Sequence, residues 1–505
     1  MAKDLQTVVQ QFRSYTRRMK DYSEAIAVLG WDLRTGAPKK GQGQRSEVIG
    51  SLSTELFKMG VSAEMKEFID SLSETGAYEQ LDEVTRALVR ECKKEYERSH
   101  SIPSDLYQEY VVLTSKSETA WEEARHNNDF ANFQTYLEKI VDYTKRFIEI
   151  WGYQEHPYNT LLDQYEPGIT VAILDPLFAD LRAQSVALLQ AIQERGRKTD
   201  TSFFGQRFPI DDQRRFSEHV LKKIGYDFEA GRLDVSAHPF ATGLNPGDVR
   251  ITTRFQEDDF RFAIFSTIHE GGHAIYEQNI GKELVGTILS EGASMGIHES
   301  QSRFMENMIG RSFGFWTYFY DDLRNMFPAQ FADVSIDQFY RAVNQVEPSL
   351  IRTEADELTY NLHIMVRYEL EKALIGGDLQ VADLPGAWND KMKEYLGVVP
   401  QTDSDGVLQD VHWSFGAFGY FPSYSLGNIY AAQFEAALRR DMPDYKEAIQ
   451  RGEFSAVKSW LNDKIHKYGR LLEPKDILAS VTGESIDARY LVNYLQSKYT
   501  EVYDL

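Results

Sequence analysis

Apolar side chains recur at every third or fourth position along most of the chain, which is the spacing of an amphipathic helix. The pattern runs from Asp4 to Leu29, and it returns in several segments up to Trp151. Between them, the glycines and the proline of the segment Trp31 to Arg45 predict a loop. The alternation typical of strands is missing from this part of the sequence, so we predict a helical N-terminal half over residues about 1–230.

Strand character is confined to residues 233–255. This segment is rich in the turn-forming residues Pro and Gly, and it ends in an alternating run from Val249 to Phe255. Alternation of that kind predicts a β-strand, and the turn residues before it favour antiparallel pairing with a neighbour. We therefore expect one small antiparallel β-sheet.

Helical periodicity returns directly after this segment. It predicts one helix at about Asp258–Asn279, a second at about Glu291–Ile309, and long helices through the C-terminal third. No Pro/Gly/Ser-rich linker marks a domain boundary. The pattern predicts a mainly α protein with a small sheet, organised as a single domain over residues 1–505, of which the half from about 231–505 carries the motifs described below.

Composition and net charge exclude several classes of protein. Hydrophobic residues make up 42% of the 505 residues and charged residues 26%, as in soluble globular proteins. The net charge of −22 argues against nucleic acid as the main partner, because phosphate binding requires clustered Lys and Arg. No run approaches the roughly 20 apolar residues of a membrane span, and the segment beginning Met1-Ala2-Lys3-Asp4 lacks the apolar core of a signal peptide. With Cys92 as the one cysteine, we expect a cytoplasmic protein without a disulfide framework.

The candidate chemistry lies in His269-Glu270-Gly271-Gly272-His273. Histidines four positions apart project from one side of a helix, so both imidazoles can reach one metal ion. The chain has only 11 histidines, which makes an accidental match to this spacing rare. The two glycines cost roughly 1 kcal/mol each relative to alanine inside a helix. We therefore expect them to form a cleft floor that the substrate backbone approaches closely.

A third ligand is needed, because catalytic zinc normally has three protein ligands and an open position for water. The extended motif with a third histidine requires glycine at position 276 and histidine at 279, and Tyr276 and Asn279 exclude it. A glutamate of the following helix is the other common solution. Glu291, Glu299 and Glu306 are the candidates, and spacing favours Glu299, near the middle of that helix.

With such a site, Glu270 has a defined task. It removes a proton from zinc-bound water as the water attacks a carbonyl carbon, and it then passes the proton to the departing amine. The alternative is that His269 and His273 are ordinary buried histidines and Glu270 a solvated charge. A closed structural metal site would normally use four protein ligands, often cysteines, and Cys92 offers only one.

Arginines of the same region could bind a substrate carboxylate. A guanidinium can hold both oxygens of a terminal carboxylate, and Arg250, Arg254 and Arg352 fall in the interval from residue 238 to 412, which also contains the motif. For any single arginine, a structural salt bridge is the more common explanation.

Several motifs in order resemble those of the M32 family of metallocarboxypeptidases, also called thermostable carboxypeptidase 1 or carboxypeptidase Taq. They are His238-Pro239-Phe240, Asp248-Val249-Arg250-Ile251-Thr252, His269-Glu270-Gly271-Gly272-His273, His298-Glu299-Ser300-Gln301, Ile351-Arg352-Thr353-Glu354-Ala355-Asp356 and Gly406-Val407-Leu408-Gln409-Asp410-Val411-His412-Trp413. The length of the segments that flank these motifs and their helical periodicity also agree with the family, so the resemblance covers essentially the whole chain.

The resemblance implies a saddle-like helical zincin body with a deep substrate groove and the small sheet near the active site. It implies an enzyme, usually a homodimer, that releases C-terminal amino acids one at a time with broad specificity from peptides with a free C-terminus. One Zn²⁺ per subunit is implied, with Co²⁺ as a possible substitute.

The resemblance also implies roles for individual residues. Glu299 becomes the third metal ligand, and Arg352, with Arg250 and His238 as helpers, becomes the candidate for holding the terminal carboxylate. His412 and Tyr420 become candidates for stabilising the oxyanion. Two other functions stay open: a metallo-oligopeptidase or endopeptidase with the same chemistry, and a non-catalytic helical peptide-binding protein with a structural metal.

Overall fold

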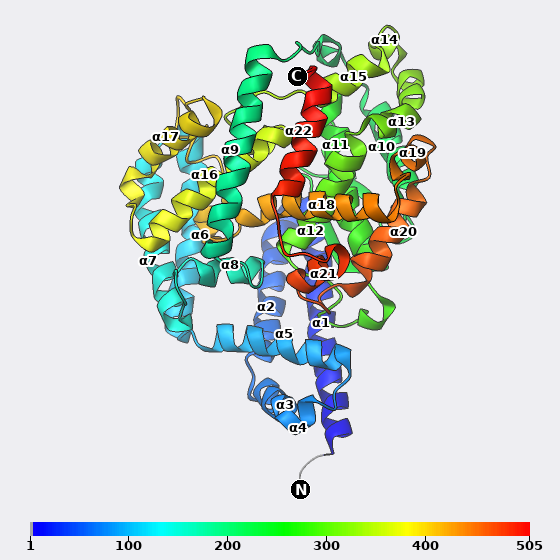
Figure 1. Cartoon of the computed structure of the whole chain (residues 1–505). Coiled ribbons are helices and arrows are strands. Elements are labelled where there is room, and N and C mark those ends of the chain that lie inside the picture. The colour runs from blue at the N-terminus through cyan, green and yellow to red at the C-terminus, as the bar shows by residue number, and fades with distance from the viewer. Residues whose placement is uncertain (1–3) are drawn as a thin grey trace. The chain divides into compact units, whose positions relative to one another are not determined.

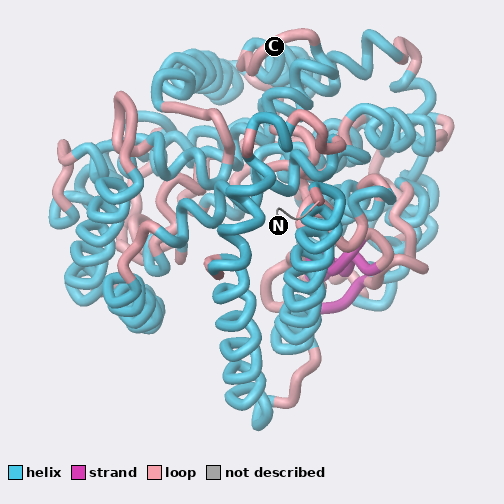
Figure 2. Tube along the Cα trace, turned by 90° about the horizontal axis from the view of Figure 1, so that it is seen from below, coloured by secondary structure: helices cyan, strands magenta, loops and turns pink. Residues whose placement is uncertain are grey.

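A computed structural model describes residues 4–505 and is helical through most of its length (Figure 1). Met1 to Lys3, which begin the segment predicted to lack the apolar core of a signal peptide, lie outside the described residues. Strands appear in a single small patch (Figure 2). Within residues 4–505, no helix combines the length and the apolar character needed to cross a bilayer. The prediction of a mainly α protein with one small sheet is confirmed.

The chain forms two compact units that alternate along the sequence. Unit 1 comprises Met1–His100, Thr201–Ile336 and Phe434–Glu484, and unit 2 comprises Ser101–Asp200, Asp337–Gln433 and Ser485–Leu505. The organisation as a single domain with halves divided near residue 230 stays a prediction.

Unit 1 contains the sheet and the helix that bears the His-Glu motif. Its helices and strands are α1 (Leu5–Thr35), η1 (Lys39–Gly41), α2 (Gln42–Gly60), α3 (Ala63–Ser73), α4 (Thr75–Tyr78), α5 (Glu83–His100), η2 (Ser202–Gly205), α10 (Ile210–Ile224), β1 (Leu233–Val235), β2 (Ala241–Asn245), β3 (Asp248–Thr253), α11 (Phe260–Gln278), η3 (Lys282–Leu284), α12 (Met295–Arg303), η4 (Phe304–Gly310), α13 (Phe313–Met326), α14 (Pro328–Phe331), α19 (Tyr445–Gln450), α20 (Phe454–Lys464), η8 (His466–Tyr468) and α21 (Pro474–Thr482).

Unit 2 is built from helices alone within the described residues. They are α6 (Ser104–Asn127), α7 (Phe130–Trp151), α8 (Asn159–Tyr165), α9 (Val171–Arg195), η5 (Arg352–Glu354), α16 (Glu357–Gly376), η6 (Val381–Asp383), α17 (Leu384–Leu396), η7 (His412–Phe415) and α22 (Arg489–Tyr503). The helices α15 (Ile336–Val343) and α18 (Pro422–Asp441) each contain a boundary between the units. Helix α16 packs against α9 and α17 and is buried on every side, so it forms the core of unit 2.

The sheet is mixed rather than antiparallel. Its strand order is β1-β3-β2, in which β2 pairs with β3 antiparallel and β1 pairs with β3 parallel. The turn at Pro246-Gly247 correctly indicated the β2–β3 hairpin. The prediction of a wholly antiparallel sheet was wrong because β1 joins the opposite edge of β3, a long-range pairing that no local turn signal specifies.

Two element boundaries also differ from the prediction. Helix α1 continues through Trp31 to Thr35, so the predicted loop from Trp31 to Arg45 shrinks to a short break at Gly36 and Pro38 followed by η1. The predicted helix at Glu291–Ile309 begins later, at Met295, where the side chain of Ser294 accepts the N–H of Ile297. After Arg303 it widens into the π-helix η4, a form that recurs at functional sites.

Helix α11 lies at the centre of unit 1. It packs against β2, β3, α10, α12 and η4, and apolar residues bury it on several sides. Its start is fixed by Asp259, whose carboxylate accepts the N–H groups of Arg261 and Phe262. The helix that carries the motif is therefore a rigid core element, as a precise catalytic site requires.

Candidate active site

The two glycines of the motif make room for neighbouring helices. A Cβ at Gly272 would lie 2.6 Å from the carbonyl oxygen of Gln301 in α12, and a Cβ at Gly271 would lie 2.7 Å from the Leu221 side chain in α10. Both glycines are buried. The expectation that they form a cleft floor for the substrate backbone was wrong; their cost in helix propensity is offset by close packing of α11 against protein.

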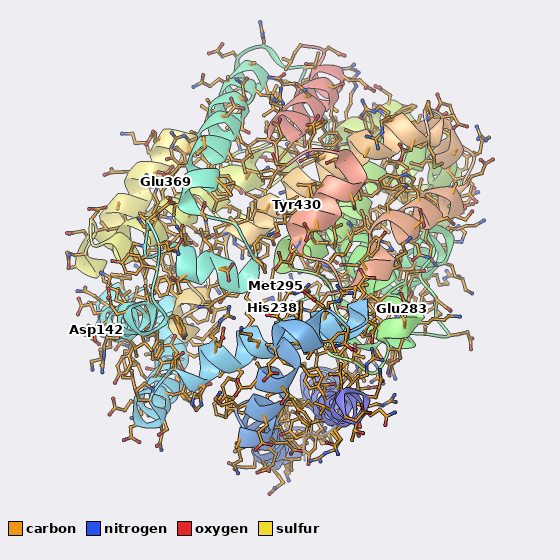
Figure 3. All side chains as sticks on the ribbon, turned by 60° about the horizontal axis from the view of Figure 1, so that its bottom comes forward. Asp142, His238, Glu283, Met295, Glu369 and Tyr430 are labelled. Atoms are coloured by element: carbon orange, nitrogen blue, oxygen red, sulfur yellow. The ribbon has the colours of Figure 1, made fainter. Side chains whose placement is uncertain are left out.

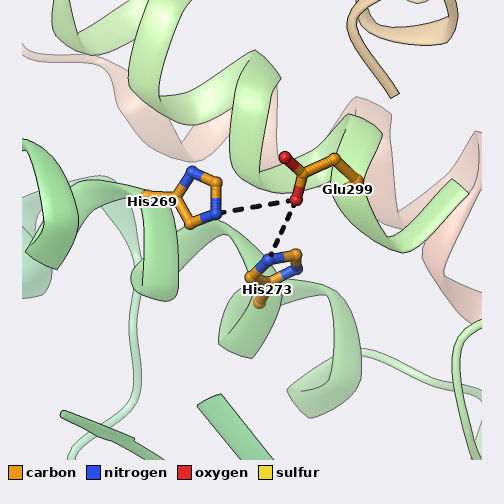
Figure 4. Close-up of side chains that lie close together, drawn as sticks. All are labelled: His269, His273 and Glu299. Carbon is orange, nitrogen blue, oxygen red and sulfur yellow. Dashed lines mark ion pairs between the residues drawn. The ribbon is translucent and has the colours of Figure 1, made fainter. Parts of the chain in front are cut away.

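His269, His273 and Glu299 come together across α11 and α12. The Nε2 atoms of His269 and His273 lie 3.6 Å and 3.4 Å from Oε2 of Glu299, and Figure 4 shows both rings turned toward that carboxylate. One ligand atom from each residue falls within 4.8 Å of the other two. Within residues 4–505 this is the only such group of three or more His, Cys, Asp or Glu residues.

The two other glutamates considered as ligands point elsewhere. Glu291 precedes α12 and pairs with the buried ammonium of Lys20 at 3.0 Å and with Arg470 at 3.5 Å. Glu306, in η4, accepts a hydrogen bond at 2.9 Å from Nδ1 of His269, the ring nitrogen that faces away from Glu299. Of the three glutamates, only Glu299 lies where both Nε2 atoms converge.

Each histidine of the motif is held by its Nδ1 atom. His269 bonds to Glu306, whose carboxylate also accepts from Arg303 at 3.3 Å and from Arg311 at 3.1 Å. Nδ1 of His273 lies 2.5 Å from Nδ1 of His298. A ring whose Nδ1 carries the proton has its lone pair on Nε2, so both rings can present Nε2 to a metal ion.

Burial shapes the charges of this site. Desolvation raises the pKa of Glu270 to about 7, with the neighbouring His269 opposing that rise. Desolvation lowers the pKa of His273 to about 4, and the nearby His298 adds to the effect, so the ring is neutral as a metal ligand must be. Desolvation acts to raise the pKa of Glu299, but Arg303 and the two histidines hold it well below its usual range. Desolvation acts to lower the pKa of His269, but Glu299 and Glu306 raise it above its usual value. The site thus combines two imidazoles, one fixed carboxylate and one buried carboxyl poised to exchange a proton.

The predicted helpers His238 and Arg250 also belong to unit 1. Arg250, on β3, donates two hydrogen bonds to Asp248, at 2.8 Å and 2.7 Å, and its guanidinium lies 5.8 Å from the centre of the Trp31 ring. His238 is exposed in the loop between β1 and β2 (Figure 3). Arg254, the third arginine of the interval, lies 4.7 Å from the centre of the Phe262 ring.

Arg352, His412 and Tyr420 form a separate cluster in unit 2. Arg352 is only 6% exposed and donates to Oδ1 of Asp410 from Nε at 3.0 Å and from Nη2 at 2.7 Å. Its Nη1 donates to the Tyr360 hydroxyl at 3.1 Å. Asp410 also accepts from the buried Arg367, at 2.7 Å.

The aromatic part of this cluster surrounds His412. Its ring lies 4.4 Å from that of Phe421 and 5.4 Å from that of Tyr420, and its Nε2 lies 3.3 Å from the Tyr424 hydroxyl. Burial lowers the pKa of His412 to about 4, although Asp410 opposes the change. A neutral His412 can donate one hydrogen bond and accept another.

Sequence reasoning missed several residues of the two clusters. From the sequence, Glu306 was a candidate metal ligand rather than the hydrogen-bond acceptor of His269. Asp410 and His298 belonged to motifs but had no role assigned to them. Arg34 was missed because it falls within the loop predicted from Trp31 to Arg45, whereas it lies near the end of α1. Its guanidinium lies 3.4 Å above the centre of the Phe240 ring; desolvation there lowers the pKa of Arg34, and the carboxylate of Glu270 opposes that change.

Comparisons with known proteins agree over the full length of the chain. Residues 11–499 match the model of the carboxypeptidase Taq (M32) metallopeptidases. Carboxypeptidase 1 of Bacillus subtilis is 52% identical, over 99% of this chain and 99% of its own. Thermostable carboxypeptidase 1 of Thermus thermophilus is 42% identical, over 98% of each. The crystal structure of the M32 carboxypeptidase from Deinococcus radiodurans R1 superposes with a TM-score of 0.95 at 37% identity, covering 99% of this chain and 100% of that one.

Proposed function

Because the chain belongs to the carboxypeptidase Taq (M32) family and is therefore a metallocarboxypeptidase, we propose that it uses zinc to release C-terminal amino acids with broad specificity. The observation that carries the zinc assignment is the convergence of His269, His273 and Glu299 on one point. Two imidazole nitrogens and one carboxylate are a donor set typical of catalytic zinc. Cobalt is a possible substitute, because nitrogen and oxygen ligands accept both metals.

When bound, the metal supplies a Lewis acid that polarises the scissile carbonyl and favours ionisation of the attacking water. Glu270 is the proposed base. It follows His269 directly on α11, is buried, and has a pKa raised to about 7 by desolvation. It accepts the proton of the attacking water and then delivers it to the nitrogen of the departing amino acid.

For the substrate carboxylate we propose Arg352, helped by Arg250 and His238. The contacts of Arg352 with Asp410 and Tyr360 use Nε, Nη1 and Nη2 once each. Each terminal nitrogen of a guanidinium has two N–H groups, so a second donor on each is left for a ligand. Asp410 then fixes the plane of the guanidinium, and His412 and Tyr420 are the proposed donors to the oxyanion.

We further propose that the enzyme is a cytoplasmic homodimer. Support for the compartment comes from Cys92, which as the one cysteine of the sequence allows no intrachain disulfide and so fits a reducing environment. The dimer rests on the resemblance to the family. Light scattering on the purified protein tests it, with an expected mass of twice 58.0 kDa.

The decisive experiment compares pairs of peptides with identical sequence, one ending in a free carboxylate and the other in an amide. Mass spectrometry of timed digests is expected to show a ladder that shortens from the C-terminus for the free acid and little cleavage of the amide. Undiminished cleavage of the amide, or internal cuts in both peptides, would favour the oligopeptidase alternative. Metal analysis of the same preparation is expected to show one zinc per chain.

A further inference from the structure

We propose that His298 and Glu277 act as positioning residues that fix the Nδ1 proton of His273, and that this Glu277–His298 relay sets how tightly His273 can hold the metal. The proposal rests on the metal site proposed above. Neither residue is one of the three that converge on the metal site: Glu277 lies one turn beyond His273 on α11, and His298 directly precedes Glu299 on α12.

The relay is a chain of two short contacts behind His273. On one side of the His273 ring, Nε2 faces Glu299. On the other, Nδ1 lies 2.5 Å from Nδ1 of His298, whose Nε2 lies 2.7 Å from Oε1 of Glu277. The two rings are 4.5 Å apart and inclined at 34°, so this contact is made edge to edge through their nitrogens.

Proton positions in this chain are not independent. In its neutral form the His298 imidazole has one N–H and one lone pair, and a carboxylate such as that of Glu277 can only accept. It therefore selects the form of His298 that carries its proton on Nε2. Nδ1 of His298 is then an acceptor, so the contact with His273 requires the proton of His273 to lie on Nδ1. The lone pair of His273 is left on Nε2, where the metal site needs it.

The reverse arrangement would disable the ligand. If Nδ1 of His298 donated to Nδ1 of His273, the His273 proton would occupy Nε2 and block that atom as a ligand. The lone pair on Nε2 of His298 would also face the carboxylate oxygen of Glu277 at 2.7 Å, which is repulsive. Through His298, Glu277 thus determines which nitrogen of His273 carries the proton.

Two glycines outside the motif make space for the relay. A Cβ at Gly243 in β2 would overlap Oε2 of Glu277, and a Cβ at Gly292 would lie 2.5 Å from Cδ2 of His298. Neither glycine has a positive φ, so space rather than backbone conformation excludes a side chain. The hydroxyl of Tyr276 accepts the N–H of Ala293 at 3.0 Å, which fixes the segment beside Gly292. The surrounding backbone is therefore shaped around both members of the relay.

The other motif histidine has a different support. His269 donates directly to Glu306, without an intervening ring, and Arg303 and Arg311 hold that carboxylate. Loss of a carboxylate or other partner behind a metal-binding histidine typically weakens metal binding about 10- to 100-fold. Because the two supports share no residue, their losses are expected to be independent.

The test measures zinc affinity by competition with a chelator, starting from metal-free protein. His298→Phe keeps a ring of similar size but removes both nitrogens, and we expect zinc binding about 10- to 100-fold weaker. Glu277→Gln keeps the shape of Glu277, and we expect a smaller loss, because an amide oxygen can still accept from His298. Glu283→Gln, in η3 (Figure 3), is the matched control, with wild-type affinity expected.

A double-mutant cycle separates a relay from general disturbance of the fold. Adding Glu277→Gln to His298→Phe is expected to cause no further loss of affinity, because the link to His273 is already broken. Adding Glu306→Gln to His298→Phe is expected to cause a further loss close to that of Glu306→Gln alone. Thermal unfolding of each metal-free variant identifies any that fail to fold, and the nearly isosteric Glu277→Gln keeps the test available if His298→Phe does not.

The outcomes distinguish this inference from the proposed function. Wild-type zinc affinity in folded His298→Phe or Glu277→Gln, with tight binding by the unaltered protein, would overturn the relay and leave the metal site intact. Additive losses for His298→Phe and Glu277→Gln would also overturn it. A wild-type protein that binds no zinc would overturn the metal site and the relay together.

Discussion

The charged cluster around His269 and His273 in unit 1 and the one around Arg352 in unit 2 satisfy their charges in different ways. In unit 2, Arg352 and Arg367 both bond to Asp410 at 2.7 to 3.0 Å, so one carboxylate fixes two guanidinium groups and one positive charge is left over. In unit 1, Nε2 of His269 and of His273 lie 3.6 Å and 3.4 Å from Oε2 of Glu299. Those separations are longer than a normal hydrogen bond. They suit a cation placed between the three atoms.

The difference shows how one chain can use buried charge for two purposes. A cluster whose charges are paired internally holds a side chain in a fixed geometry, as Asp410 holds Arg352. In unit 1, Arg303 pairs with Oε1 of Glu299 at 2.7 Å, while Oε2 and the two Nε2 atoms face one another. The unit 1 cluster is thus built to bind a cation, and the unit 2 cluster is built to orient Arg352 for an anion.

Removal of the metal is expected to have the largest effect. Dialysis against a chelator takes away the cation that the unit 1 cluster requires, so we expect complete loss of peptide hydrolysis and its recovery on addition of zinc or cobalt. The helices of unit 2 are expected to keep their stability. Activity that survives with no metal detectable by elemental analysis would contradict the proposed metal site.

Glu270→Gln is expected to have the next largest effect. The amide keeps the volume of the side chain but cannot accept a proton, so kcat is expected to fall about 100- to 10,000-fold, the range for loss of a general base. Zinc content is expected to remain at the wild-type level, because Glu270 is not one of the three converging residues. Turnover close to wild type would exclude Glu270 as the base.

Asp410→Asn tests the paired cluster. It leaves Arg352 and Arg367 buried without their carboxylate, and a loss of about 3 to 5 kcal/mol in the free energy of unfolding is expected. Urea denaturation at neutral pH measures it. Zinc affinity is expected to stay unchanged, which would separate the orienting cluster from the binding one.

The same variant predicts a pH dependence. Burial acts to raise the pKa of Asp410, but Arg352 and Arg367 hold it well below its usual range. A lowered pKa in the folded state contributes stability that is fully present above the unfolded-state value of about 4 and is lost as the pH falls through lower values. We therefore expect Asp410→Asn to flatten the loss of stability of the wild-type protein below about pH 4. An unchanged acid dependence would contradict the pairing.

Arg250→Lys is expected to have the smallest effect on stability. Its side chain is 20% exposed and that of its partner Asp248 33%, so solvent screens the pair and a change within about 1 kcal/mol is expected. Arg352→Lys, in the buried cluster, is the matched comparison for KM toward free-acid peptides. A larger rise in KM for Arg250→Lys than for Arg352→Lys would reverse the proposed order of carboxylate binder and helper.

The sequence predicted those parts of the structure that depend on local periodicity. The spacing of His269 and His273 placed both rings on one face of α11, and Glu299 was favoured on the following helix. The mixed sheet, the length of α1 and the widening of α12 into η4 could not be predicted, because they depend on contacts between distant segments. For the same reason Gly271 and Gly272 were assigned to the substrate, although their neighbours are α10 and α12.

The π-helix η4 has a consequence for insertions and deletions. A π-turn contains one more residue than an α-turn, so deletion of a single residue within Phe304–Gly310 would let the segment revert to α-helical geometry with its two ends still in phase. Arg311 lies five positions after Glu306, which it contacts now, and a four-residue step in an α-turn would keep the two side chains on one face. A deletion within the α-helical part of α11 or α12 would instead rotate the flanking side chains relative to one another by roughly 100°, the angle per residue of an α-helix. Loss of a single residue is therefore expected to be tolerated better in this turn than in the α-helices that carry the metal-site residues.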